Sequence, residues 1–144
     1  MSPDLTQPLR AAIVAYAAVT SQLEAYKGSF PVFTKRPVPT DAPYPCIVIS
    51  QDISNGNEDG INDFRPVVVR DIAVYGLNSQ PGDVRVVEEI SYSLRELFHR
   101  QKGSLTVAGW SVIDVVVSGP SDAPAEDLIT GRRVELTVRL AAQA

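Results

Sequence analysis

The sequence predicts an α+β fold, in which two main helices pack on one face of an antiparallel β-sheet and a β-hairpin projects from the body. Two segments repeat apolar residues at the three- and four-residue steps of a helix. Other segments are rich in β-branched residues, and one alternates strictly between apolar and polar residues. The order helix, strand, strand, helix, strands is typical of helices on an antiparallel sheet. The length of 144 residues fits one domain, residues 1–144.

The first predicted helix lies near the N-terminus and has one apolar face. Ser2 and Pro3 have the residue types of an N-cap and a first helical position. The predicted buried face follows at helical spacing and consists of Leu5, Leu9, Ile13, Tyr16, Thr20 and Leu23. Residues 30–45 then contain five prolines, which lack amide donors and favour extended backbone in the residue before them. We expect a stiff, irregular connection there.

Two strands are predicted on either side of a polar segment, residues 54–63. The first covers Cys46–Ile53 and the second covers Arg65–Leu77. The second strand would reach about 40 Å, at about 3.3 Å per residue. The expected radius of gyration of the domain is only about 15 Å. Part of this hairpin should therefore project from the body.

A second helix and three further strands are predicted in the remaining chain. The apolar stripe of the helix is formed by Val84, Val87, Ile90, Leu94, Leu97 and Phe98. Glu96 and Arg100 stand four residues apart, a spacing that favours an ion pair. The strands are predicted at Leu105–Val107, Trp110–Ser118 and Arg132–Leu140. Because the last strand alternates apolar and polar residues, one sheet face is expected to be wet in an isolated subunit.

Charge disfavours nucleic-acid binding without excluding it locally, and composition excludes several other classes of protein. Lys plus Arg number 13 against 17 Asp plus Glu, giving a formal net charge of -4 at pH 7, the wrong sign for a protein whose main partner is a phosphate backbone. No apolar run approaches the roughly 18 residues that span a bilayer, so no membrane partner is expected. The first residues also lack the pattern of a secretory leader. One Cys and one His are too few for an internal disulfide or a structural zinc site, and no cofactor is predicted.

No arrangement of residues predicts an enzyme. Nucleophilic catalysis by Cys46 would need a nearby base, but the only histidine, His99, lies at the end of the second predicted helix. We interpret Cys46 as a small core residue and His99 as a solvated residue near a helix C-terminus. Glu88 and Glu89 lie about 100° apart around their helix and do not converge as an acid–base pair must. Trp110 is interpreted as core or sheet-edge packing.

The polar segment of the hairpin resembles the first half of a calcium loop. Oxygen-bearing residues and a glycine follow the spacing of such a loop, at Asn55, Asn57, Asp59, Gly60 and Asp63. The twelfth position is Pro66 instead of a bidentate Glu, and the flanking segments are predicted strands. A polar hairpin tip is therefore favoured, since Asn, Asp and Gly tolerate left-handed backbone. Calcium binding stays an alternative.

Two arginines, Arg132 and Arg133, follow Gly131 at the start of the last predicted strand. They are a candidate rim for an acidic partner, and the alternative is a solvated pair without a partner. A chain with one wet sheet face, a long hairpin and no catalytic site is typical of a protein that works by assembling.

The order and spacing of these elements resemble the tail-terminator (tail-completion) proteins of long-tailed bacteriophages and of phage-derived gene transfer agents. The resemblance covers about Leu5 to Leu140. It is carried by the opening helix LRAAIVAYAAV, the strands PYPCIVISQ and VVVRDIAVYG, the helix VRVVEEISYSLRELF after a small turn, and the closing strand GRRVELTVRL after an acidic loop.

The resemblance implies a structural virion protein that is not an enzyme. Such a protein forms a hexameric ring, terminates the tail tube and provides the surface to which the head connector attaches. Its implied partners are copies of itself, the tail tube protein and the head–tail connector or neck protein, with DNA only as passing cargo in the lumen. It would be made in the host cytoplasm and reside in the virion, at the tail–neck junction. The hairpin is then the candidate inter-subunit or lumen contact, through Asn55, Asn57, Glu58, Asp59, Asp63 and Arg65.

Three alternatives remain open from the sequence. A neck or head–tail joining protein belongs to the same class of assembly proteins. A monomeric adaptor or immunity-like binding module would carry one acidic docking patch. A small-ligand enzyme or binding protein would need a deep pocket with convergent polar groups.

Overall fold

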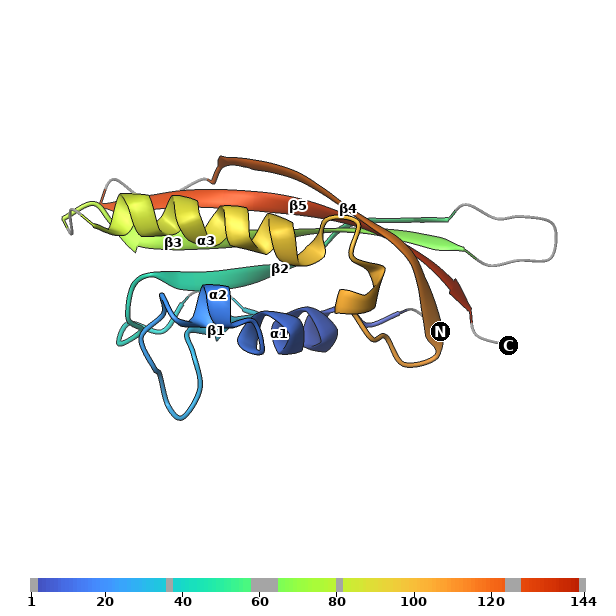
Figure 1. The fold of residues 1–144 in the computed structure, drawn as a ribbon, viewed down its shortest axis with the longest axis horizontal. Helices are drawn as coiled ribbons and strands as arrows, with labels where there is room; N and C mark the ends of the chain where they lie inside the picture. The colour runs from blue at the N-terminus through green and yellow to red at the C-terminus, as the bar shows by residue number, and fades with distance from the viewer. Residues whose placement is uncertain (1–2, 36–37, 58–64, 80–81, 124–127, 143–144) are drawn as a thin grey trace.

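The computed structural model describes residues 3–35, 38–57, 65–79, 82–123 and 128–142. In these residues the helices are α1 (Thr6–Val14), α2 (Ala17–Thr20) and α3 (Asp83–Phe98), with a short 3₁₀ helix, η1 (Lys102–Ser104). The strands are β1 (Val32–Phe33), β2 (Cys46–Asn57), β3 (Pro66–Leu77), β4 (Trp110–Asp122) and β5 (Ile129–Ala142). They form a sheet in the order β1-β2-β3-β5-β4, in which β1 pairs in parallel with β2 and the other pairs are antiparallel (Figure 1). The predicted α+β fold class is confirmed.

The main core lies between the sheet and the helices. Helix α3 contacts β3, β4 and β5, whereas α1 contacts β1 and β2. The strand residues that point toward the helices are buried: Ile47, Ile49, Val68, Ile72, Val74, Val115, Val117, Val134, Leu136, Val138 and Leu140. They pack against Leu5, Leu9, Ile13, Val87, Ile90, Leu94 and Phe98. Each fully buried Val, Leu, Ile or Phe side chain contributes about 1.5–3 kcal/mol, so this layer is the main source of stability.

The N-terminal helix is shorter than predicted. Ser2 lies outside the described residues, and α1 begins at Thr6, whose amide donates a hydrogen bond to the carboxylate of Asp4 at 3.0 Å. The backbone of Tyr16 is extended (φ -92°, ψ 105°) and separates α1 from α2. Val19, in α2 after this break, is fully buried in the core.

β2 and β3 form the predicted hairpin, and its far part projects beyond the helices (Figure 1). β2 is longer than the predicted strand, since its pairing with β3 continues to Asn57 opposite Pro66. The ladder consists of backbone hydrogen bonds, so the polar sequence does not prevent it. On its other side β2 pairs with β1 only at Ile47 and Val48. Beyond Val48, the described residues place no strand beside the outer edge of β2.

The second half of the chain follows the prediction with two differences. Helix α3 and strands β4 and β5 lie where periodicity predicts them, and both strands are longer than expected. The segment Leu105–Val107 is not a strand, although Leu105 and Val107 are buried. It is a connection that follows η1. Strand β1, inside the proline-rich connection, was not predicted because two residues show no periodicity.

The sheet face opposite the helices, here called the open face, is only partly exposed. Burial alternates along β5 as predicted, with Val134, Leu136, Val138 and Leu140 buried and the residues between them half-exposed. On the open face, however, Cys46, Val48, Ala73 and Tyr75 form a second buried cluster, against which Phe33, Val38, Tyr44, Ala123 and Ile129 pack. The predicted wet face is therefore wrong at the end of the sheet that these five partly buried residues cover.

No helix in the described residues is long and apolar enough to cross a membrane.

Candidate functional site

The two arginines of the predicted rim, Arg132 and Arg133, lie on opposite faces of the sheet because successive side chains of a strand alternate. Arg132 forms ion pairs with Glu88 of α3 (3.3 Å) and with Asp122 of β4 (2.8 Å). Arg133 points to the open face, where its Nη1 donates to Oδ2 of Asp71 at 3.0 Å. The two arginines therefore do not form one rim.

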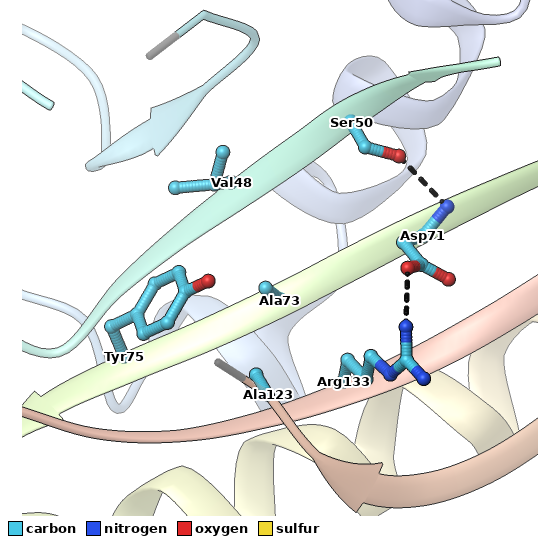
Figure 2. Close-up of a pocket in the computed structure, with 7 residues that line it drawn as sticks. All are labelled: Val48, Ser50, Asp71, Ala73, Tyr75, Ala123 and Arg133. Atoms are coloured by element: carbon cyan, nitrogen blue, oxygen red, sulfur yellow. Dashed lines mark hydrogen bonds and ion pairs between the residues drawn. The ribbon is translucent and has the colours of Figure 1, made fainter. Parts of the chain in front are cut away.

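The Asp71–Arg133 pair borders a hollow of about 240 Å³ in the open face (Figure 2). Tyr75 lies at one end of this hollow and Ser50 and Asp71 lie at the other (Figure 2). Its residues are Val48, Ser50, Asp71, Ala73, Tyr75, Ala123 and Arg133. Ligand pockets usually enclose about 300–1,000 Å³, so this hollow suits a single side chain better than a small-molecule substrate.

Asp71 has an unmet hydrogen-bonding capacity at the edge of the hollow. The Ser50 hydroxyl accepts from the Asp71 amide at 2.9 Å, and Arg133 donates to one carboxylate oxygen. The other oxygen, Oδ1, is buried and has no hydrogen-bond partner in the part of the chain that the structure describes. Oδ1 is therefore closed to a donor from another molecule, whereas the Asp71 side chain as a whole is 18% exposed.

Asp71 is not among the predicted site residues, although the sequence carries a signal for it. Arg70 and Asp71 are adjacent charges inside an otherwise apolar strand. Arg70 points to the helix side and is buried, with Nε 2.7 Å from the Ser50 carbonyl and Nη2 3.0 Å from the Thr6 hydroxyl. It thereby ties the start of the projecting hairpin to helix α1. Buried charges inside a strand indicate such specific partners.

The outer surface of α3 is acidic and carries an exposed aromatic ring. Tyr92 is 61% exposed, and neither its hydroxyl nor the carboxylate of Glu96 has a partner in the described residues. The other charges of this surface are paired, Glu88 with Arg132 and Arg85 with Glu89. The helix therefore offers one free hydroxyl and one free carboxylate to a partner.

The free edge of β4 is covered by the end of α3. His99 is not the solvated residue expected from the sequence, because its Nδ1 accepts a hydrogen bond from the Val117 amide. The Arg95 guanidinium donates to the carbonyl of Val117 at 2.7 Å, and the Arg100 amide donates to that of Val115 at 2.7 Å. Such contacts prevent an edge strand from pairing with another chain.

The predicted ion pair between Glu96 and Arg100 is not formed. Arg100 lies beyond the last residue of α3, with a backbone φ of 59°. Its guanidinium instead contacts Asp114 of β4 at 2.5 Å. The helix ends before the four-residue spacing can bring the two side chains together.

Most of the predicted hairpin tip is not placed. Glu58, Asp59 and Asp63 lie outside the described residues. Asn55 and Asn57 lie in the far part of β2, and Arg65 is exposed just before β3. The described residues contain no group of His, Cys, Asp or Glu that could hold a metal ion.

Cys46 and His99 are not brought together. Cys46 is buried in β2, whereas His99 contacts β4 at the other side of the sheet, with β3 and β5 between these strands. Trp110 is buried at the start of β4, as interpreted from the sequence.

A separate exposed turn holds Lys27, whose pKa is raised by a hydrogen bond to Tyr26 and by the nearby carboxylate of Asp41.

Comparisons with known proteins identify the fold. No family model matches the chain, and no curated protein sequence is similar to it. A solved structure described as the virion of a native gene transfer agent (GTA) particle contains a chain with the same fold. The two superpose with a TM-score of 0.70 over 97% of this chain and 95% of that chain, at 11% sequence identity. The likeness extends over the whole described fold and shows that the two chains share it.

Proposed function

We propose that the chain is a structural virion protein that forms a hexameric ring, terminates a tail tube and provides the attachment surface for the head connector. The observation that carries this proposal is the fold shared, over almost the full length of both chains, with a chain of a gene transfer agent virion. The order of sequence elements supports the same assignment independently. The protein would reside at the tail–neck junction of the virion.

A closed ring requires each subunit to use two different surfaces, one for each neighbour. The described chain has two such surfaces on opposite sides, the outer surface of α3 and the open face with its hollow. The covered edge of β4 disfavours a ring closed by strand pairing at that edge. Contacts between subunits are therefore favoured at the outer surface of α3 and at the open face of the sheet.

The projecting hairpin is proposed as a further contact between subunits or with the lumen. Its far part extends beyond the helices, and no strand of the described residues lies beside β2 after Val48 (Figure 1). A partner strand there would satisfy the backbone groups of this edge. The side chains proposed to take part are Asn55, Asn57, Glu58, Asp59, Asp63 and Arg65.

The proposed role needs neither a catalytic step nor a cofactor. Tail termination depends on presenting a surface that the next tube subunit does not fit, which is a matter of binding specificity. The net charge of -4 would disfavour adhesion of DNA that passes through the ring. The proposed partners are the tube protein, the connector or neck protein and other copies of this chain.

Reconstitution with tail tubes tests this function. Native mass spectrometry of the purified chain should show hexamers at high concentration or after addition of tubes. Electron microscopy should then show a ring at one end of each tube and no further growth on addition of tube subunits. A chain that stays monomeric and leaves tube growth unchanged would contradict the proposal.

A further inference from the structure

We propose that the hollow in the open face of one subunit receives the Tyr92 side chain of the neighbouring subunit. This inference rests on the proposed ring and specifies its main subunit contact. It is carried by the shape and chemistry of the hollow and by the exposure of Tyr92.

The two surfaces lie where a head-to-tail contact needs them. Helix α3 packs on one face of the sheet, and the buried stripe Val87, Ile90 and Leu94 turns Tyr92 toward the outside. The hollow opens on the opposite face of the sheet, in β2, β3 and β5. A subunit can therefore insert its tyrosine into one neighbour while its own hollow receives the tyrosine of the other. Repeated with a closing rotation, this contact forms a ring.

The chemistry of the hollow suits a tyrosine. Its apolar part is formed by Val48, Ala73 and Ala123, which can cover an aromatic ring. Its polar end contains Asp71 and Arg133, whose side chains are 18% and 40% exposed. A tyrosine hydroxyl can donate to the exposed part of the Asp71 carboxylate or accept from Arg133 while the ring fills the apolar part. Tyrosine combines these two properties and is enriched at the centres of protein interfaces.

A charge contact beside the tyrosine strengthens the match. Glu96 is exposed one turn after Tyr92 and has no ion pair in the described residues. Arg133 borders the hollow and its side chain is 40% exposed, although one of its nitrogens binds Asp71. A guanidinium has five donor hydrogens, so Arg133 can bind a second carboxylate. Glu96 of the neighbouring subunit would then form an ion pair with Arg133.

Two variants test the contact from its two sides. Tyr92→Ala removes the inserted side chain, and Ala73→Leu fills the hollow. Each variant should keep the circular dichroism spectrum and the cooperative melting of the wild type. Each should raise the protein concentration needed for half-maximal hexamer formation by at least about tenfold, since central aromatic residues dominate interface energies. If Ala73→Leu fails to fold, Ala123→Leu blocks the hollow from the end of β4.

Mixing the variants distinguishes a head-to-tail contact from other arrangements. The Tyr92→Ala chain retains an intact hollow, and the Ala73→Leu chain retains an intact tyrosine. At protein concentrations at which neither variant forms hexamers, their mixture should therefore form heterodimers, seen by native mass spectrometry after isotope labelling of one chain. Tyr92→Phe should assemble less well than the wild type and better than Tyr92→Ala, because it keeps the ring and lacks the hydroxyl.

Matched controls come from the same helix. Glu89→Ala removes a charge already paired with Arg85 and should leave assembly unchanged, whereas Glu96→Ala should weaken it. If the wild type forms hexamers and Tyr92→Ala forms them equally well, the proposed Tyr92 contact is wrong, whereas the proposed ring is retained. A wild type that never forms hexamers, alone or on tubes, overturns the ring and this contact together.

Discussion

The imidazole Nδ1 of His99 accepts a hydrogen bond from the backbone amide of Val117 at 3.0 Å. His99 directly follows α3, and Val117 lies in β4, the edge strand of the sheet. Arg95 binds the same edge of β4, because its guanidinium donates to the backbone carbonyls of Val117 and Gly119. The end of one helix thus occupies backbone groups that would otherwise pair with a foreign strand.

Replacement of His99 by Ala should destabilise the fold by about 1–3 kcal/mol, because it leaves the Val117 amide without its acceptor. Urea denaturation measures this change, and amide exchange should show faster exchange at Val117. Because Nδ1 accepts, the neutral ring must carry its proton on Nε2, which nitrogen NMR can verify. Gln101→Ala, at an exposed neighbouring position, should stay within about 0.5 kcal/mol of the wild type. Equal effects of the two substitutions would argue against the edge contact.

Replacement of Arg95 by Met should cost about 1.5–3 kcal/mol, because its guanidinium makes two hydrogen bonds to β4 carbonyls. Arg85→Met on the same helix is the control. Arg85 forms an exposed pair with Glu89, and such pairs contribute about 0.2–1 kcal/mol. Thermal unfolding of both variants gives the comparison. A loss at Arg85 as large as that at Arg95 would show that helix substitution alone explains the effect.

Replacement of Leu136 by Ala should cost about 2–5 kcal/mol, since its side chain is fully buried beneath the helices. Thr137→Ala, the next residue on the open face, should change stability by no more than about 0.5 kcal/mol in the monomer. Chemical denaturation at low protein concentration measures both. Similar losses at the two positions would contradict burial on one face of β5.

Replacement of Gly76 by Ala should destabilise the packing of β3 against α3. The added Cβ would lie 2.8 Å from Cγ2 of Val87 and 3.0 Å from Cβ of Asp83. Overpacking of this kind typically costs about 1–3 kcal/mol. Gly103→Ala is the matched control, because its Cβ would meet nothing within 4 Å. A melting temperature unchanged in both variants would refute the close approach of strand and helix.

Replacement of residues 58–64 by an Asn-Gly turn should leave the fold nearly unchanged, because loop length alters closure entropy only slowly. The strand pairing up to Asn57 opposite Pro66 is retained. If the hairpin contacts a neighbour, the shortened chain should form fewer hexamers and leave tails of uncontrolled length. Normal assembly would contradict the hairpin's role. A calcium-binding tip would instead make the wild type melt at a higher temperature with added calcium and lower with chelator.

The sequence alone determined the elements that have long, regular patterns. Helix α3 and strands β3 and β5 lie within a few residues of their predicted positions, because each repeats its apolar residues over several turns or pleats. The same alternation predicted that Leu136 is buried and Thr137 is not. Proline content predicted the irregular connection before β2, and the length of β3 predicted a hairpin that projects from the body.

Only the tertiary structure decided the contacts between distant residues. Asp71 meets Arg133 because β3 and β5 are adjacent and their register pairs Asp71 with Glu135 and Ala73 with Arg133, so that Arg133 lies diagonally across from Asp71 on the same face. The extended Tyr16 and the strand β1 also depend on packing, since neither follows a local pattern. The role of His99 was missed for the same reason. Periodicity reports which face of an element is buried, whereas a hydrogen-bond partner depends on strand order, register and helix ends, which no local pattern specifies.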